Sequence, residues 1–209
     1  MPRWNAFSRL PAPEPPLREE LLDAARLQDF ARVLATTLTS APRPRRAPSL
    51  ARLADNVRRI DEAHRLLAAD ARQHEFVGPA GEWLLDNYHL VDAEVRALRR
   101  DLPRRFYRRL PFVREGQAVV ARVEALARAF IRHTDSRVDR GPMLGYLDAF
   151  QTVAPLTLGE LWAWPSIVRL VLLENLRRLA DGVLAAREAR RAADAYLDAI
   201  DGPGGFRAP

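Results

Sequence analysis

Hydrophobic residues return every three or four positions along most of the chain, a spacing that places them on one face of an α-helix. The clearest example starts after Pro79, where one apolar stripe begins at Trp83 or Leu84. It continues through Tyr88, Val91, Val95, Leu98 and Leu102. We expect a helix over residues 79–102 that buries this stripe and ends at Pro103, because the residue before a proline avoids the helical conformation.

The same spacing predicts further helices on both sides of this one. They cover residues 17–40, 49 to about 71, 113–133, 143–153, 158–180 and 181–201. Ser49 is expected to cap the second helix, and a short turn could form over residues 104–110. No alternating run of Val, Ile or Thr reaches the length of a strand. The pattern predicts an all-α protein, an irregular bundle of about six or seven helices with no sheet.

Proline and glycine set the ends of the predicted domain. Five prolines lie in residues 1–16, where they fix backbone φ and remove hydrogen-bond donors, so we expect a disordered leader there. We expect a single helical domain over residues 17–201 and a flexible tail over residues 202–209. The predicted order within the domain is a first helix (17–40), a linker of proline and arginine (41–48), a core (49–180) and a C-terminal helix (181–201).

The most apolar part of the chain lies within residues 158–180, so this helix should be the most deeply buried. Thr157 and Glu160 have the three-residue spacing of a capping box, which predicts where the helix begins. We expect its apolar stripe to pack against that of residues 79–102. The side chains expected in this contact are Trp83, Tyr88, Leu98, Trp162, Ile167, Leu172 and Leu176.

Composition narrows the class of protein. The chain has 209 residues, of which 48% are hydrophobic and 29% charged, as in ordinary globular proteins. All 33 basic residues are arginine, and they alternate with 27 acids in nearly every segment. Because no nucleic-acid-binding motif accompanies the net charge of +6, we expect no nucleic-acid partner.

Several chemistries are excluded by what the sequence lacks. Without cysteine there is no disulfide, no thiolate catalysis and no cysteine-based zinc site. The N-terminus lacks the apolar core of a signal peptide, and no uncharged apolar window reaches the ~18 residues that span a bilayer. We expect no transmembrane segment in this chain.

Carboxylates stand next to tryptophans at two places, and each place has two interpretations. Glu82 with Trp83, and Glu160 with Trp162, could bind a sugar. The acids could equally stabilise a helix N-terminus while the indoles fill the core, and this second interpretation is the simpler one. Asp86 lies between Glu82 and His89 at helical spacing, which could suit a metal. However, the Glu-x-x-His pairs of carboxylate metal sites are missing.

No arrangement of residues suited to catalysis appears. A glycine-rich phosphate loop, a nucleophile elbow and an HExxH motif are all absent from the sequence. We therefore assign no catalytic, metal-binding or cofactor-binding residue and expect no cofactor. The candidates for interaction or for a structural hydrogen-bond network are Glu82, Trp83, Asp86, Asn87, His89, Glu160, Trp162, Glu174 and Asn175.

Four strings carry a resemblance to a known family. They read EWLLDN, RRDLPRRFYRRLP, and LTLGELWAWP followed by LLENLRRLA. In this order they resemble the N-terminal helical region of cyclic β-1,2-glucan synthases, over about residues 49–180. The resemblance implies a large inner-membrane enzyme that polymerises glucose from UDP-glucose and cyclises the product. In that family the glycosyltransferase domain, the transmembrane helices and a phosphorylase-like domain all lie downstream, so their catalytic residues have no counterparts here.

The resemblance leads us to expect a non-catalytic scaffold or regulatory module of such a synthase. The chain would be a truncated product, an isolated N-terminal module or a fragment of a split gene. It would lie in the cytoplasm or at the cytoplasmic face of the inner membrane, with the remainder of the synthase as its partner. The alternatives are a module that binds β-1,2-glucan, an independent enzyme on a helical fold, and a membrane-surface protein that uses its arginines.

Overall fold

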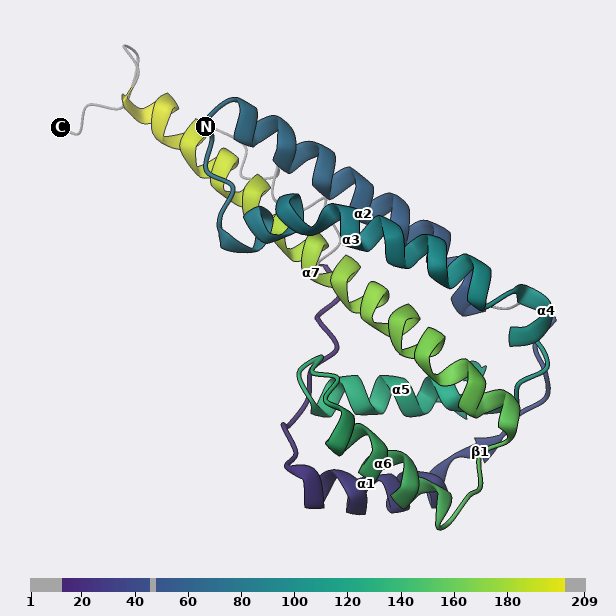
Figure 1. Ribbon diagram of the computed structural model, residues 1–209. Helices are drawn as coiled ribbons and strands as arrows, with labels where there is room; N and C mark the ends of the chain where they lie inside the picture. Colours follow the sequence, from purple (N-terminus) through teal and green to yellow (C-terminus); the bar gives the residue numbers. More distant parts are fainter. Residues whose placement is uncertain (1–12, 46–47, 202–209) are drawn as a thin grey trace.

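Helices make up most of the protein in the computed structural model, which describes residues 13–45 and 48–201 (Figure 1). The predicted helical class is confirmed, although a small sheet accompanies the helices. The predicted tail lies outside the described residues, as do residues 1–12 of the predicted leader and residues 46–47 of the predicted linker.

Seven helices and three strands follow one another along the described residues. The helices are α1 (Ala24–Thr37), α2 (Pro48–Arg72), α3 (Pro79–Asp101), α4 (Arg104–Tyr107), α5 (Arg122–His133), α6 (Arg140–Gln151) and α7 (Leu158–Asp201). The strands are β1 (Thr39–Ser40), β2 (Phe112–Glu115) and β3 (Ala118–Ala121).

The long helix α7 is the central element. In Figure 1 it runs diagonally between the α2–α3 pair on one side and α5, α6 and α1 on the other. α3 packs on α7 as predicted, and α1 packs on α6. The Tyr146 hydroxyl of α6 donates a hydrogen bond to the Leu126 carbonyl oxygen of α5 at 3.1 Å. Leu98, Leu126 and Ile167 are completely buried, and each such side chain contributes about 1.5–3 kcal/mol to stability.

A β-hairpin occupies the start of the segment that we predicted to be helical from residue 113. β2 and β3 pair antiparallel, and β1 pairs with β2 to complete a three-stranded sheet. Gly116 has φ of +59° at the first turn position, which favours a two-residue hairpin loop. Val113 and Val120 pack with Ala125 under the hairpin. The prediction of no sheet is therefore wrong, because short apolar runs fit a strand as well as a helix.

The first helix begins later than predicted, at Ala24 instead of residue 17. Asp23 caps it, since its Oδ1 accepts a hydrogen bond from the Arg26 N–H at 2.9 Å. The preceding residues are extended, and their backbone bonds to the end of α5. The N–H groups of Glu19 and Leu22 donate to the carbonyl oxygens of Arg132 and His133 at 3.0 and 3.1 Å. The carbonyls at a helix C-terminus need such outside partners.

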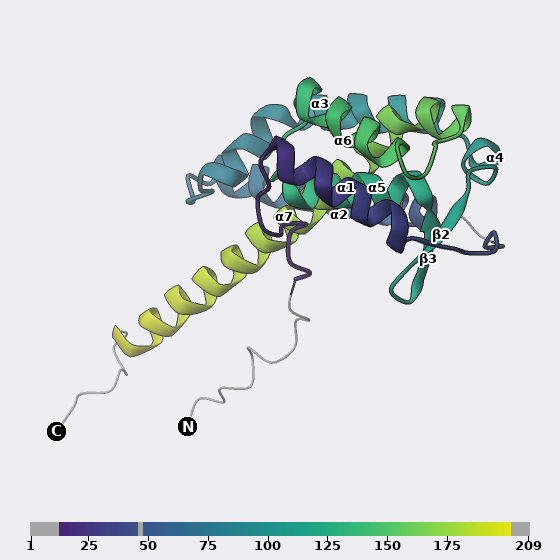
Figure 2. The same ribbon diagram turned by 90° about the horizontal axis from the view of Figure 1, so that it is seen from below.

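Two further helix boundaries differ from the predictions. α2 begins at Pro48, so Ser49 lies inside the helix and is not its cap. Residues 158–201 form one continuous helix of 44 residues, where we counted residues 158–180 and 181–201 as two helices. Beyond Arg191 this helix extends away from the other helices (Figure 2), and its side chains there are mostly exposed.

Candidate functional site

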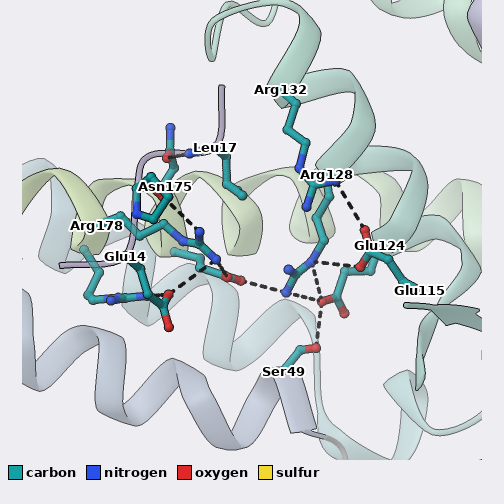
Figure 3. A network of polar contacts seen from close by, with 12 residues as sticks. Glu14, Leu17, Ser49, Glu115, Glu124, Arg128, Arg132, Asn175 and Arg178 are labelled. Carbon is teal, nitrogen blue, oxygen red and sulfur yellow. Dashed lines mark hydrogen bonds and ion pairs between the residues drawn. The ribbon is translucent and has the colours of Figure 1, made fainter. Parts of the chain in front are cut away.

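Glu124 is the centre of a buried hydrogen-bond network (Figure 3). The side chain lies on α5 and is 1% exposed. Its Oε1 accepts hydrogen bonds from Ser49 Oγ at 2.7 Å and Arg128 Nη2 at 3.0 Å, and its Oε2 accepts one from Tyr107 Oη at 2.6 Å. Burial and the charge of Glu124 raise the pKa of Tyr107 far above its ordinary value, so the phenol remains a donor. One carboxylate thereby joins α2, α4 and α5.

Arg128 extends this network to α7. Its Nη2 donates to Glu174 Oε2 at 2.8 Å, and Glu174 Oε1 accepts from Arg178 Nη2 at 2.8 Å. Burial opposes the charged guanidinium of Arg128, but the carboxylates of Glu124, Glu174 and Glu115 outweigh it and raise the pKa of Arg128. Because buried charges without partners are strongly destabilising, these helices are held in one mutual arrangement.

Glu115, at the end of β2, lies at the edge of the network. Its Oε2 is 3.9 Å from Arg128 Nε, and its Oε1 is 3.7 Å from Arg132 Nη1. These separations are too long for hydrogen bonds. Burial therefore prevails and raises the pKa of the Glu115 carboxyl in spite of the two arginines. The ionised form of Glu115 is therefore less favourable in the folded protein than it is in water.

A second buried carboxylate joins the beginnings of α5 and α7. Glu160 is completely buried, and Arg122 binds it in bidentate fashion through Nε at 2.8 Å and Nη2 at 2.6 Å. The Glu160 N–H is 3.3 Å from Thr157 Oγ1, and the Thr157 N–H donates to Glu160 Oε2 at 2.9 Å. These two bonds are the predicted capping box.

A third buried carboxylate, Asp70, joins α2 to α7. Its Oδ1 accepts hydrogen bonds from Arg187 Nη2 at 2.7 Å and Arg191 Nη2 at 2.9 Å, while Arg187 Nε donates to Oδ2. The hydrogen bond from Arg187 lowers the pKa of Asp70 in spite of burial. Three separate arginine–carboxylate clusters therefore connect α7 to its neighbours.

Three of the candidate residues lie in buried contacts of α7. Glu160 and Glu174 belong to the clusters described above. Asn175 holds the chain that precedes α1, because its Oδ1 accepts from the Leu17 N–H at 2.6 Å and its Nδ2 donates to Ser136 Oγ at 2.9 Å. The structure thus places all three where side chains connect separate segments.

Five other candidates lie on α3, and the structure does not bring them into one site. Glu82, Asp86 and His89 are exposed. Asn87 Nδ2 donates to the Trp83 carbonyl oxygen at 2.9 Å in the same helix, where we expected a hydrogen bond between helices. Within residues 13–45 and 48–201, no group of three or more His, Asp or Glu side chains is placed to hold a metal ion. That these five residues take part in binding or in a structural hydrogen-bond network between elements stays a prediction.

Trp83 and Trp162, which we expected in the core, are 52% and 75% exposed. α7 buries the face that carries Trp164, Ile167 and Val171, and Trp162 lies on the opposite face. Trp83 stands beside a hollow of about 350 Å³ between α2, α3 and α7. This hollow is lined by Leu67, Ala80, Trp83, Leu84, Leu176, Leu179, Ala180 and Val183. It offers apolar contact only.

Sequence reasoning missed Glu124, Arg128 and Tyr107 at the centre of the network. One signal was available, since Glu124 and Arg128 are four residues apart within an otherwise apolar run, where two charges need each other as partners. Their remaining partners, Ser49 and Glu174, lie 75 residues from Glu124 and 46 from Arg128 along the chain. Helical periodicity carries no information about such distant pairs.

The fold and these clusters define a mostly helical protein whose helices are joined by buried arginine–carboxylate contacts. Among the described residues, no helix has the length and apolar character needed to cross a bilayer. No model of a known protein family matches the sequence.

A known protein resembles most of the chain. Over 150 residues, 72% of this chain, the sequence is 43% identical to cyclic beta-(1,2)-glucan synthase NdvB of Rhizobium meliloti (strain 1021). The predicted resemblance to a cyclic β-1,2-glucan synthase is therefore confirmed. The aligned segment makes up only 5% of that synthase, so the chain spans a small part of its relative.

We predict that Arg128→Met lowers the free energy of unfolding by about 3–5 kcal/mol, because it leaves the buried Glu124 without a cationic partner and Glu174 with Arg178 alone. Urea denaturation followed by circular dichroism measures the change. The matched control is Arg96→Met, because Arg96 pairs with Asp92 on the exposed surface of α3 and should contribute less than about 1 kcal/mol. Equal losses in the two variants would contradict the assigned role of Arg128.

We predict effects of opposite sign for Glu115→Gln and Asp70→Asn at neutral pH. The raised pKa of Glu115 means that its ionisation costs stability above that pKa, so Glu115→Gln should stabilise the protein there. The lowered pKa of Asp70 means that its charge contributes stability above the unfolded-state pKa, which is lost as pH falls through the folded-state pKa. Asp70→Asn should therefore destabilise the protein at neutral pH.

Unfolding curves recorded from neutral pH down into the acid range test this pair of variants. The Glu115→Gln difference should shrink as pH falls through the raised pKa of Glu115 toward the ordinary carboxyl pKa of about 4, because native Glu115 is then protonated. The Asp70→Asn difference should shrink only below that range, as pH falls through the lowered pKa of Asp70. A destabilising Glu115→Gln variant at neutral pH, or a difference that does not change with pH, would contradict the assignment.

Proposed function

We propose that this chain is a non-catalytic scaffold or regulatory module of a cyclic β-1,2-glucan synthase. Its identity of 43% to a segment of such a synthase supports this proposal. The module would lie at the cytoplasmic face of the inner membrane and contact the remainder of the synthase. The parent enzyme, and not this chain, would polymerise and cyclise glucose from UDP-glucose.

The observation that carries the non-catalytic role is the use of the buried carboxylates. A general acid or base must be able to exchange a proton with its substrate. Glu124, Glu174 and Glu160 instead bind the guanidiniums of Arg128 and Arg122, and the bidentate pair at Glu160 occupies both of its oxygens. Such pairs occupy the acceptor positions of the carboxylates and restrict their geometry. This arrangement favours a structural role for all three.

The β-1,2-glucan-binding alternative rests on one observation, the exposure of Trp83 next to the exposed carboxylates of Glu82 and Asp86. Stacking on an indole needs nearby polar groups that bind the sugar hydroxyls. The hollow beside Trp83 is lined by apolar side chains and supplies none, so the scaffold is the better supported role.

The test is to delete this segment in the bacterium that makes it and to supply the chain again from a second gene. We expect deletion to lower cyclic glucan production and the returned wild-type chain to restore it, with synthase co-purifying on the chain. The purified chain alone should not transfer glucose from UDP-glucose. Transfer by the chain alone, or unchanged glucan production after deletion, would contradict the proposal.

Calorimetry with cyclic β-1,2-glucan separates the two roles. A scaffold should release no heat of binding. Binding that is lost in Trp83→Ala but kept in Trp162→Ala would instead favour the glucan-binding module, with Trp162→Ala as the matched control because it also removes an exposed indole.

A further inference from the structure

The short helix α4 and the residue pair after it carry four exposed arginines, Arg104, Arg105, Arg108 and Arg109. Among the residues that the structure describes, no carboxylate oxygen lies within 4.0 Å of any of them. Arg32, Arg58 and Arg96 each pair with an acid one turn away, whereas other exposed arginines also lack such a partner. Among the described residues, only α4 and the two residues after it hold four arginines within six consecutive positions. Charge is therefore locally unbalanced at α4, although acids and arginines alternate along most of the sequence.

An exposed apolar stripe lies on the first two turns of α7. Leu158, Leu161, Trp162 and Pro165 follow the i, i+3, i+4, i+7 spacing of one helix face. Leu158 and Trp162 are 69% and 75% exposed, and Leu161 is 39% exposed. Removing such large apolar side chains from water would stabilise a contact made by this face. In these two turns the face is exposed, because their buried side chains lie on the opposite face of α7.

The arginines and the apolar stripe belong to one surface. A Cβ atom built on Gly159 would lie 3.9 Å from Leu110 Cδ2, so the first turn of α7 touches the residue that follows Arg109. Arg169, on the next turn of the same face, lies 3.7 Å from Asp101, just before α4. Both views of the molecule place α4 at the end where α7 begins (Figures 1 and 2). We name these eight residues the α4–α7 surface; its members are Arg104, Arg105, Arg108, Arg109, Leu158, Leu161, Trp162 and Pro165.

We propose that the α4–α7 surface binds the surface of an anionic lipid bilayer. Arginines without acidic partners complement the phosphates of anionic headgroups, and each basic residue near such a surface contributes about fivefold to binding. Tryptophan prefers the boundary between headgroups and acyl chains, and the burial of leucine at this boundary is favourable in free energy. An acidic protein would satisfy the arginines, but the tryptophan and leucine stripe beside them favours a boundary that is polar on one side and apolar on the other. This inference does not depend on the proposed function.

The test measures sedimentation of the full chain with sucrose-loaded vesicles of phosphatidylglycerol and phosphatidylcholine. We expect binding that requires phosphatidylglycerol and weakens as salt is added, because salt screens the arginines. Replacing all four α4–α7 arginines by glutamine should weaken binding at least tenfold. The matched control replaces Arg26, Arg32, Arg58 and Arg96 by glutamine, which lowers the net charge of +6 by the same four units and should change binding less than threefold.

The apolar half of the surface is tested separately. Leu158→Ser combined with Trp162→Ser should weaken binding at least tenfold while the circular dichroism spectrum stays that of the wild type, because both side chains are exposed. In a Trp4→Phe, Trp83→Phe background, the fluorescence comes from the exposed Trp162 and the buried Trp164. It should shift to shorter wavelength on addition of phosphatidylglycerol vesicles, because Trp162 then leaves water while Trp164 is already buried.

Several results would overturn the proposal. If the two four-arginine variants lost vesicle binding equally, net charge alone would explain the effect. Binding to pure phosphatidylcholine as strong as to phosphatidylglycerol vesicles would also contradict the proposal. So would a serine variant that binds vesicles as well as the wild type. A synthase that is captured through the same eight residues while vesicles are not bound would assign the surface to a protein partner instead.

Discussion

The contact of Arg128 with Glu124 and Glu174 is the interaction on which the rest of the structure depends. It lies where α5 meets α7, and through Glu124 it also reaches Ser49 of α2 and Tyr107 of α4. Apolar side chains tolerate small shifts between helices, but a buried guanidinium and two carboxylates require particular distances. We infer that this network fixes the relative positions of helices that the apolar core alone would hold less precisely.

Much of the fold could be predicted from helical spacing, and the errors have identifiable physical causes. α3 and the beginning of α7 were predictable because a long apolar stripe and a capping box are local signals. The β2–β3 hairpin was missed because its strands are four residues long, too short for periodicity to separate strand from helix. The start of α1 was missed because residues before Ala24 bond to the distant end of α5 instead of forming their own helix.

The candidate site was predictable only in part, for a related reason. Glu160, Glu174 and Asn175 stood out as polar residues on the most apolar helix, and the structure places all three in buried contacts. Their partners Arg122, Arg128 and Leu17 lie 38, 46 and 158 residues away, so no local pattern could indicate the pairs. Trp83 and Trp162 were misplaced because hydrophobicity predicts burial on average but does not say which face of α3 or α7 meets the core.

Arginine therefore has two different roles in this protein. Inside, each guanidinium of the three clusters neutralises a buried acid and joins helices. Outside, at α4, four guanidiniums stand without acidic partners beside an exposed indole, a combination suited to a charged boundary. The scaffold role that we propose would use both features, the fixed interior and the outer face. The aligned segment is 5% of the related synthase.

Hydrogen exchange of backbone amides tests most directly whether the Arg128 network holds α5 and α7 as one unit. We predict that amides of α5 and of residues 167–178 of α7 exchange only through global unfolding, with one shared free energy of opening. In Arg128→Met both segments should lose protection by the same amount. Loss of protection in one segment while the other keeps its wild-type value would contradict this account.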